Sequence, residues 1–459
     1  MRHVRESFMI KLANQNRKES NMSHGQSTLN LIGIKDKNVH LEEDFFAFED
    51  VALGGKQVPH KIIKAYLQAP HNPPCPKCQG ATVKWGKKPS NIRIPHITKH
   101  PTILRLRKTR YRCKSCGHTH ILETSLVQKN CFISKATKKS IMLDALEVVP
   151  EKTIAKNNDV SPSTVSRVLN PLLYERKTNT KTLPKNIMMD ELRVVKDTEG
   201  AAMSFIFADA KTHEIQDVLP DRRLHHLEAY FRRFPKEVRY HVETVTVDMY
   251  APYIQLVEDV FPKAKIILDR FHVVQLLLRA LLQTRIQVMK KFAPDSKEYK
   301  LLKKYWKHLQ KKHKDLDSVY RFYCYHTRSY STSFEKVEEL LEIDEELTKT
   351  YWRIHSLVQS FMEGDQKRFF DLLQQETTGL SGYAVTAIQT LRKMEEYLIN
   401  SMEYAYSNGP LEGLIRKAKT LCRVAYGYRS FERFKNRFLL ISHQVMPVTG
   451  RPLYNKKAS

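Results

Sequence analysis

The chain of 459 residues carries 77 Lys and Arg against 49 Asp and Glu, which gives a formal net charge of +28 and a pI near 9.7. Hydrophobic residues make up 41% of the sequence, enough for packed cores in about two to four domains. The positive charge is spread along the whole chain, which favours a polyanionic partner such as DNA. No uninterrupted apolar run of about 18 residues predicts a membrane span, and residues 1–5 do not resemble a signal peptide.

The first predicted elements are a flexible segment and a metal-binding module. Residues 1 to about 40 are polar, mixed in charge and poorly periodic, which is typical of flexible chain. Between about 70 and 125 the sequence is rich in Pro, Gly, Cys and short β-like runs. This composition is typical of a small module that a metal ion stabilises.

Four cysteines in this module form two knuckles about 34 residues apart, Cys75 with Cys78 and Cys113 with Cys116. Each two-residue spacer lets two sulfur atoms converge on one ion, and four thiolates suit tetrahedral Zn²⁺. We therefore predict one structural zinc ion, with redox-active or unpaired cysteines as the alternative. The strand-like runs between the knuckles, 92–94 and 103–106, predict a β-hairpin. An odd total of seven cysteines with this spacing favours reduced thiols in a cytoplasm over disulfides.

Residues 151–169 have the spacing of a helix-turn-helix. Ala155 is small enough for two helices to cross, and Val165 and Val168 follow where they would pack the second helix onto the first. Ser161 fits the N-cap of the second helix. Asp159 stands at the turn position that often carries Gly, and Asp tolerates a left-handed backbone.

The second helix would lie in the major groove of DNA. Its predicted DNA-contacting residues are Ser163, Thr164, Ser166 and Arg167. The alternative is an ordinary helical hairpin without DNA contacts.

From about residue 184 short apolar runs alternate with amphipathic helices. The predicted order is three strands, a helix, a strand, a helix and a strand, at 187–195, 201–210, 214–219, 224–234, 242–247, 253–261 and 265–268. A meander followed by β-α-β units implies a mixed sheet covered by helices. Residues 273–402 show no convincing strand and place apolar residues at helical spacing, so they predict a helical insertion.

A carboxylate directly follows each of two apolar runs in this region, 186–189 and 242–247. Asp190 ends the apolar run that begins at Asn186, and Asp248 follows the run 242–247. If these strands are neighbours, the two carboxylates lie close together. Carboxylates are the hard oxygen ligands that Mg²⁺ prefers. Two such ions, about 3.5–4 Å apart, activate the attacking oxygen and stabilise the leaving oxygen in phosphoryl transfer.

Glu412 is the predicted third ligand, at the start of a helix far along the chain. It shares one helical face with Arg416, Lys419 and Arg423, which we expect to contact DNA phosphates. A metal explains an acid on such a basic face better than the alternative, in which Glu412 caps the helix.

Asp269 competes with Glu412 for the role of third acid. It ends the last predicted strand, in Asp269-Arg-Phe-His272. His272 is either a structural histidine or a neighbour of the active site.

These residues together resemble the DDE transposases of bacterial insertion sequences, in the insertion sequence L-three family. The resemblance extends from about residue 22 to 445. It rests on residues 22–31, the cysteine module, the helix-turn-helix, Met189-Asp-Glu191, Val247-Asp-Met249, Asp269–His272 and Ser407–Phe434. It implies a ribonuclease-H-like core with Asp190, Asp248 and Glu412 as the metal-binding triad. It also implies that Asp269 and His272 match an accessory motif of related transposases.

The expected fold class is therefore α/β, a ribonuclease-H-like mixed-sheet core with a large helical insertion, preceded by a zinc-binding module and a helix-turn-helix domain. The expected domains are a flexible segment (1–40), the zinc module (41–128), the helix-turn-helix (129–178), the first part of the core (184–272), the helical insertion (273–402), the closing helices (403–445) and a basic tail (446–459).

The sequence thus predicts a transposase that binds terminal inverted repeats and catalyses metal-dependent cleavage and strand transfer of DNA. Its cofactors would be two Mg²⁺ or Mn²⁺ ions and one structural Zn²⁺. Two DNA ends must be brought together, so we expect a homodimer or larger assembly on double-stranded DNA, in the bacterial cytoplasm and associated with the nucleoid. Two alternatives stay open: a related DDE nuclease or integrase without an excision cycle, and a domesticated DNA-binding regulator.

Overall fold

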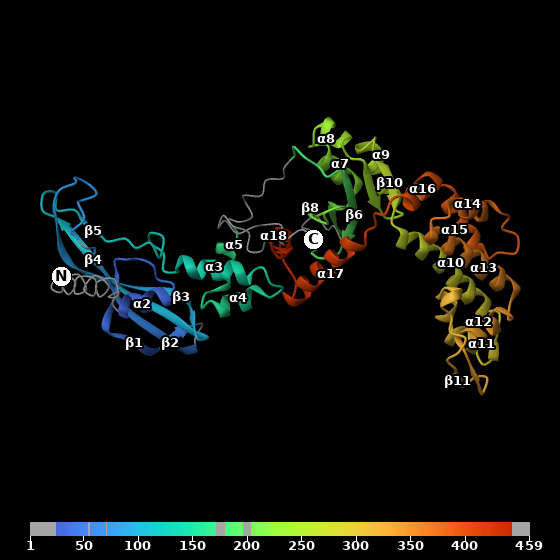
Figure 1. Cartoon of the computed structure of the whole chain (residues 1–459), viewed down its shortest axis with the longest axis horizontal. Coiled ribbons are helices and arrows are strands. Elements are labelled where there is room, and N and C mark those ends of the chain that lie inside the picture. Colours follow the sequence, from blue (N-terminus) through green and yellow to red (C-terminus); the bar gives the residue numbers. More distant parts are fainter. Residues whose placement is uncertain (1–23, 54–55, 70, 171–179, 196–202, 443–459) are drawn as a thin grey trace, which may run out of the picture. The chain divides into compact units, whose positions relative to one another are not determined.

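The computed structural model describes residues 24–53, 56–69, 71–170, 180–195 and 203–442. The chain divides into two compact units, the first made of residues 1–177, 423–426 and 436–459 and the second of residues 178–422 and 427–435 (Figure 1). The predicted basic tail 446–459 and the first 23 residues of the predicted flexible segment lie outside the described residues.

The first unit contains a five-stranded sheet. Its strands are β1 (Val39–Leu53), β2 (Lys56–Leu67), β3 (Thr82–Ile97), β4 (His100–Cys113) and β5 (Thr119–Ile121). Their order is β1-β2-β4-β3, with β5 paired to β4. The antiparallel pair β3–β4 confirms the hairpin predicted between the cysteine knuckles, with strands longer than the apolar runs indicated.

The prediction of a flexible segment over residues 1–40 is wrong for residues 24–40. Helix α2 (His24–Leu31) precedes the sheet, and β1 already begins at Val39. Leu29, Ile34 and Val39 are each at most 2% exposed and belong to the core of the sheet. Three well-spaced apolar side chains are enough to fix this segment, although its overall composition is polar.

Three helices follow the sheet in the first unit: α3 (Lys135–Asp144), α4 (Glu151–Asn157) and α5 (Pro162–Leu169). Ala155, Val165 and Val168 are buried in one core cluster, as predicted. Ser161 caps α5, since its side chain accepts a hydrogen bond from the backbone N–H of Thr164. The turn between α4 and α5 contains Asp159 at a φ of 51°, the left-handed conformation expected there.

The second unit contains a mixed sheet of five strands, β6 (Asn186–Leu192), β7 (Ser204–Asp209), β8 (Ile215–Leu219), β9 (Thr244–Val247) and β10 (Lys265–Leu268). Their order is β10-β9-β6-β7-β8, parallel from β10 to β6 and antiparallel from β6 to β8. The helices between the strands are α7 (Leu224–Phe231), α8 (Lys236–Tyr240) and α9 (Ala251–Val260), which gather beside this sheet in Figure 1. The predicted order of elements is confirmed, with α8 as an addition.

The rest of the second unit is mainly helical. Its helices are α10 (Arg270–Met289), α11 (Lys297–Lys304), α12 (Ser333–Leu341), α13 (Glu345–Glu363), α14 (Gln366–Gln374), α15 (Gly382–Arg392) and α16 (Glu395–Glu403), with two short 3₁₀ turns, η1 (His308–Gln310) and η2 (His313–Asp315). The chain continues with α17 (Gly409–Val424) and α18 (Phe431–Ile441). In the described residues, no helix combines the length and apolar character that a membrane crossing requires.

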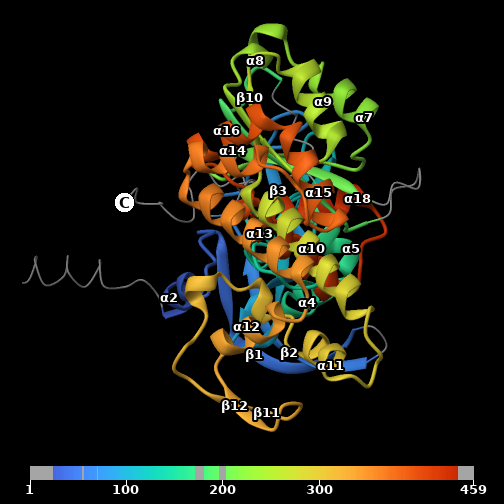
Figure 2. The same cartoon turned by 90° about the vertical axis from the view of Figure 1, so that its right-hand side faces the viewer.

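The insertion is not free of strands, contrary to the prediction. A β-hairpin interrupts the helices, formed by β11 (Phe322–Cys324) and β12 (Ser329–Ser331) (Figure 2). Strands of three residues are too short to produce a recognisable alternation of apolar and polar residues, which is why sequence analysis missed them.

Candidate functional site

Three aspartates lie at one level across three adjacent parallel strands: Asp248 and Asp269 directly follow β9 and β10, and Asp190 lies two residues before the end of β6. β9 and β10 are in register up to their last residues, so the residues that follow, Asp248 and Asp269, lie at the same level. β6 pairs with β9 up to Met188, and two residues further on it carries Asp190 at the level of Asp248. The carboxyl ends of parallel strands are where open α/β sheets bind ligands.

Helix α16 holds the outermost of these strands in place. The side chain of Asn400 donates to the backbone carbonyl of Ile266 at 3.0 Å, and the hydroxyl of Ser401 accepts from the N–H of Leu268 at 2.8 Å. β10 is therefore hydrogen-bonded along both edges, to β9 on one side and to α16 on the other. This fixes the end of the strand from which Asp269 follows.

The buried surroundings of Asp190 and Asp248 disfavour the charged form of both carboxyl groups. Burial and then the neighbouring charge of Asp248 raise the pKa of Asp190 to about 7, although the backbone N–H of Glu191 donates to it at 2.6 Å. Burial is also the main cause that raises the pKa of Asp248. Two partly buried carboxylates with raised pKa values form a site that a divalent cation would stabilise.

His272 lies between the carboxylates of Asp248 and Asp269. Its Nδ1 lies 3.1 Å from Oδ2 of Asp269 and 3.2 Å from Oδ1 of Asp248. The hydrogen bond to Asp269 is the main cause that raises the pKa of His272. Among the described residues, Asp248, Asp269 and His272 form one of two groups whose ligand atoms lie within 4.8 Å of one another.

Asn408 connects this group to helix α17, and sequence analysis missed it. Its side-chain amide donates to the carbonyl of Met189 at 2.9 Å and to Oδ1 of Asp248 at 3.2 Å. Its backbone carbonyl accepts the N–H of Glu412 at 2.9 Å, in the first turn of α17. Asn408 is 3% exposed, and its Oδ1 has no hydrogen-bond partner among the described residues. A buried oxygen without a partner beside Asp248 fits a site that receives a hydrated cation.

Glu412 does not belong to the group of ligand atoms that the described residues form around Asp248. Its side chain is 57% exposed and accepts a hydrogen bond from Arg416 at 3.0 Å. Arg416, Lys419 and Arg423 are exposed on the same helix, while Leu411 and other apolar residues of α17 are buried. The predicted basic face of α17 is therefore exposed, and the opposite face is buried.

Four cysteines of the first unit, the two knuckles Cys75 with Cys78 and Cys113 with Cys116, form the second group of ligand atoms. Sγ of Cys78 lies 3.5 Å from that of Cys113 and 3.3 Å from that of Cys116, and Sγ of Cys75 lies 3.6 Å from that of Cys116. The backbone N–H of Cys116 is the main cause that lowers the pKa of Cys113 to about 6, which favours the thiolate. Four sulfur atoms at this spacing fit one tetrahedral zinc ion.

Two family models match the chain. A transposase model matches residues 187–438, more than half of the sequence, and a model described as the zinc-finger of transposase IS204/IS1001/IS1096/IS1165 matches residues 71–116. The chain belongs to the ISL3 family of DDE transposases. Four of its seven cysteines fit a structural zinc ion, in agreement with the zinc-finger model.

A further relative covers only a part of the transposase. Over 112 residues, the chain is 33% identical to a protein of Lactococcus lactis subsp. lactis that is named ATP-dependent protease. This match covers 24% of the transposase and 36% of that relative, so the chain spans about a third of its length.

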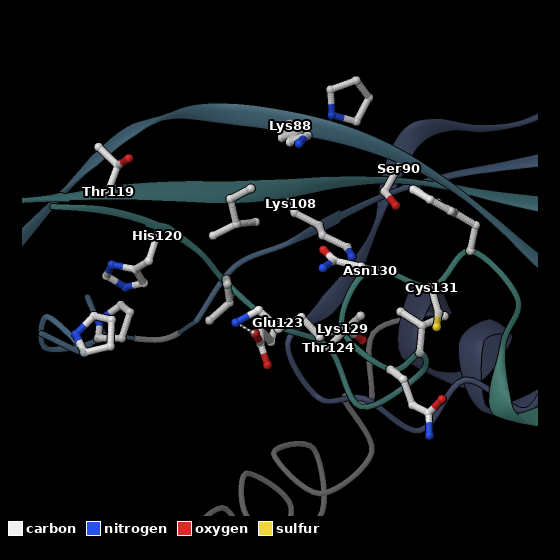
Figure 3. Close-up of a pocket in the computed structure, with 18 of the residues that line it drawn as sticks. Lys88, Ser90, Lys108, Thr119, His120, Glu123, Thr124, Lys129, Asn130 and Cys131 are labelled. Atoms are coloured by element: carbon white, nitrogen blue, oxygen red, sulfur yellow. Dashed lines mark ion pairs between the residues drawn. The ribbon is translucent and has the colours of Figure 1, made fainter.

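A basic pocket of about 790 Å³ lies on the module that contains the four cysteines (Figure 3). Lys88 and Lys108 lie opposite each other on β3 and β4, and both line the pocket. Burial is the main cause that lowers the pKa of Lys108, and the nearby charge of Lys88 adds to it. Two neighbouring ammonium groups, one of them partly buried, favour an anion such as a DNA phosphate.

The exposure of α5 corrects the prediction for its DNA contacts. Ser163 and Arg167 are exposed, but Thr164 and Ser166 are each only 7% exposed. The hydroxyl of Ser166 donates to Glu151, and that of Thr164 accepts from Arg167. Positions 164 and 166 face the neighbouring helices of the transposase, because α5 packs on both α3 and α4.

Proposed function

We propose that this transposase binds the terminal inverted repeats of its own element and catalyses metal-dependent cleavage and transfer of DNA strands. The observation that carries the proposal is the alignment of Asp190, Asp248 and Asp269 at one level across three parallel strands. The mixed sheet, in which β7 alone runs opposite to the other four strands, supports a ribonuclease-H-like core.

Asp190 and Asp248 would hold two divalent ions, Mg²⁺ or Mn²⁺, with their carboxylate oxygens. When bound, such ions supply activation of the attacking oxygen and stabilisation of the leaving oxygen. His272 orients the carboxylates of Asp248 and Asp269, and Asn408 fixes Asp248 relative to α17. Water would attack the first phosphodiester, and the freed 3′-hydroxyl would then attack the target DNA.

Glu412 remains our proposed third ligand, and Asp269 remains the competing one. Glu412 begins α17 one turn after Asn408, whose side chain bonds to Asp248. To reach an ion, Glu412 would exchange its ion pair with Arg416 for the metal, which would free Arg416 to contact a phosphate. Asp269 is supported as the third ligand by its place beside Asp248, because Nδ1 of His272 lies within hydrogen-bonding distance of both carboxylates.

DNA recognition would fall to the first unit and to α17. We propose that α4 and α5 form a helix-turn-helix with Ser163 and Arg167 as its contacts, and that the zinc module binds phosphates. Arg416, Lys419 and Arg423 would bind DNA beside the active site. Two element ends must meet, so the active form would be a homodimer or larger, acting in the cytoplasm on nucleoid DNA.

The decisive experiment is Mg²⁺-dependent cleavage of DNA that carries the element's ends, with wild type compared with the Asp248→Ala, Glu412→Ala and Asp269→Ala variants. We expect Asp248→Ala and Glu412→Ala to abolish cleavage while binding to the ends is kept. Full activity of Glu412→Ala together with an inactive Asp269→Ala would reassign the third ligand.

Two alternatives have their own tests. Cleavage and joining without excision of the element would favour a related nuclease or integrase. Normal biological function of an Asp190→Asn variant would favour a DNA-binding regulator.

A further inference from the structure

The β11–β12 hairpin exposes an unusual number of aromatic side chains. Tyr320, Tyr323, Tyr325 and Tyr330 are each between 52% and 72% exposed, all within eleven residues of sequence. Soluble proteins rarely expose neighbouring large apolar groups unless the surface has a binding role. In Figure 2 the hairpin projects from the helical region beyond α12.

This hairpin is anchored, so its tyrosines form a fixed surface. Cys324 is fully buried in the core of the unit, and the ring of Phe322 stacks on His308 at 5.6 Å. Because side chains alternate along a strand, the neighbouring position, Tyr323, faces the opposite side. Tyr323 pairs across the hairpin with Tyr330, and their ring centroids lie 5.4 Å apart.

The chain segment that contains the hairpin is strongly basic, although Arg321 pairs with Glu335 of α12. Residues 303–330 contain eight Lys and Arg against two Asp, a net charge of +6. One of the two acids, Asp317, accepts the backbone N–H groups of Val319 and Tyr320, so its charge is used within the fold. Lys311, Lys312, Lys314 and Arg328 are exposed. A surface that combines aromatic rings with cations is complementary to a nucleic acid.

We propose that the β11–β12 hairpin binds single-stranded DNA, with Tyr323 and Tyr330 stacking on unpaired bases and the nearby cations contacting phosphates. Exposed rings favour single strands over duplex because the faces of paired bases are already stacked on one another. Stacking of this kind tolerates any sequence, since every base has an aromatic face. The hairpin would therefore hold a strand that cleavage or end opening has released, apart from the site that carries the carboxylates.

The test uses the full-length protein and compares wild type with a Tyr323→Ala/Tyr330→Ala variant and a matched Tyr323→Phe/Tyr330→Phe control. Fluorescence anisotropy would measure binding to labelled oligodeoxythymidylate and to a duplex of equal length at the same salt concentration. We expect the alanine variant to bind the single strand at least about tenfold more weakly. The phenylalanine variant should bind like wild type, because it keeps both rings, and duplex binding should not change.

Several results would overturn the proposal. If the alanine variant lost affinity equally for single strand and duplex, the hairpin would be a duplex-binding surface. If its affinity were unchanged, the hairpin would not bind DNA. Loss of self-association in sedimentation, with single-strand binding kept, would indicate contact with a second copy of the chain. A catalytically inactive Asp190→Asn variant should still bind the single strand, so this test is independent of the proposed chemistry.

Discussion

The side-chain amide of Asn408 donates a hydrogen bond to Asp248, a residue 160 positions earlier in the chain. The same amide bonds to the carbonyl of Met189, directly before Asp190. One side chain thus ties two strand ends and the start of α17 together. Its effect on the site is positional, because it holds the carboxylates rather than acting on the substrate.

We therefore predict that Asn408→Ala lowers the rate of DNA cleavage by about 10–100-fold, the usual effect of losing a residue that orients a metal ligand. The apparent Mg²⁺ or Mn²⁺ affinity should fall as well, which a metal titration of the cleavage rate would measure. Gly413→Ala is a suitable control, since an added Cβ there contacts nothing within 4 Å. Unchanged metal dependence in a folded Asn408→Ala variant would contradict the positioning role.

The raised pKa of Asp190 predicts how stability depends on pH in the absence of metal. A carboxyl group whose folded pKa is about 7 favours the folded state when it is protonated, so this contribution is lost as pH rises from about 4 to 7. Thermal unfolding in a chelator should show this loss in wild type and a smaller one in Asp190→Asn. The same protonation predicts that metal binding strengthens as pH rises through 7. A pH profile of the unfolding temperature identical in both proteins would contradict this assignment.

Gly80 is predicted to be essential for the zinc site. A Cβ at this position would lie 2.8 Å from Oγ of Ser115 and 3.3 Å from Sγ of both Cys78 and Cys113. Gly80→Ala should therefore displace two thiolates, release zinc to a chelator faster than wild type and lower the unfolding temperature. Gly382→Ala is the matched control, because its Cβ would meet nothing within 4 Å. If Gly80→Ala released zinc at the wild-type rate, the two cysteine knuckles would have accommodated the added Cβ without displacing a thiolate, and the prediction would be wrong.

Sequence patterns predicted the elements whose signal is local. The succession of strands and helices from β6 to β10, the cap at Ser161 and the left-handed turn at Asp159 all follow from spacing and residue type. Patterns failed where the signal is carried by a few residues or by tertiary contacts. The segment 24–40 folds through three buried side chains, and the short hairpin strands lack periodicity. The burial of Thr164 and Ser166 arises in the packed helices, where Ser166 bonds to Glu151 of α4, and helix spacing alone does not reveal it.

Contacts between distant residues are also the reason that the candidate site was only partly predictable. The apolar runs before Asp190 and Asp248 are visible in the sequence. The strand register that places Asp269 beside these two residues is not. Asn408 had a weak signal, a buried polar residue directly before Gly409-Pro410. Only the fold shows that its amide lies between Met189 and Asp248.

Asp159 combines a backbone role with an ion pair, and the two roles make opposite predictions for a glycine variant. Its carboxylate is 3% exposed and lies 3.0 Å from Nε2 of His60 and 3.1 Å from Nε of Arg93, which joins the turn between α4 and α5 to the sheet. Glycine would relax the positive φ at this position, a gain of about 1 kcal/mol at most. Removing one partner of a buried ion pair costs about 3–5 kcal/mol. The contact to Arg93 is partly exposed, so we expect the lower end of that range.

Asp159→Gly should therefore lower the free energy of unfolding by about 2 kcal/mol, the difference between these two terms. Asp159→Asn is the informative comparison, since Asn tolerates the left-handed backbone but lacks the charge. Chemical denaturation of both variants would separate the contributions. If the ion pair dominates, both variants lose stability, and both bind the element ends more weakly because α5 is no longer held against the sheet. A glycine variant more stable than wild type would mean that backbone strain outweighs the contacts to His60 and Arg93, and that the position of α5 is set by apolar packing alone.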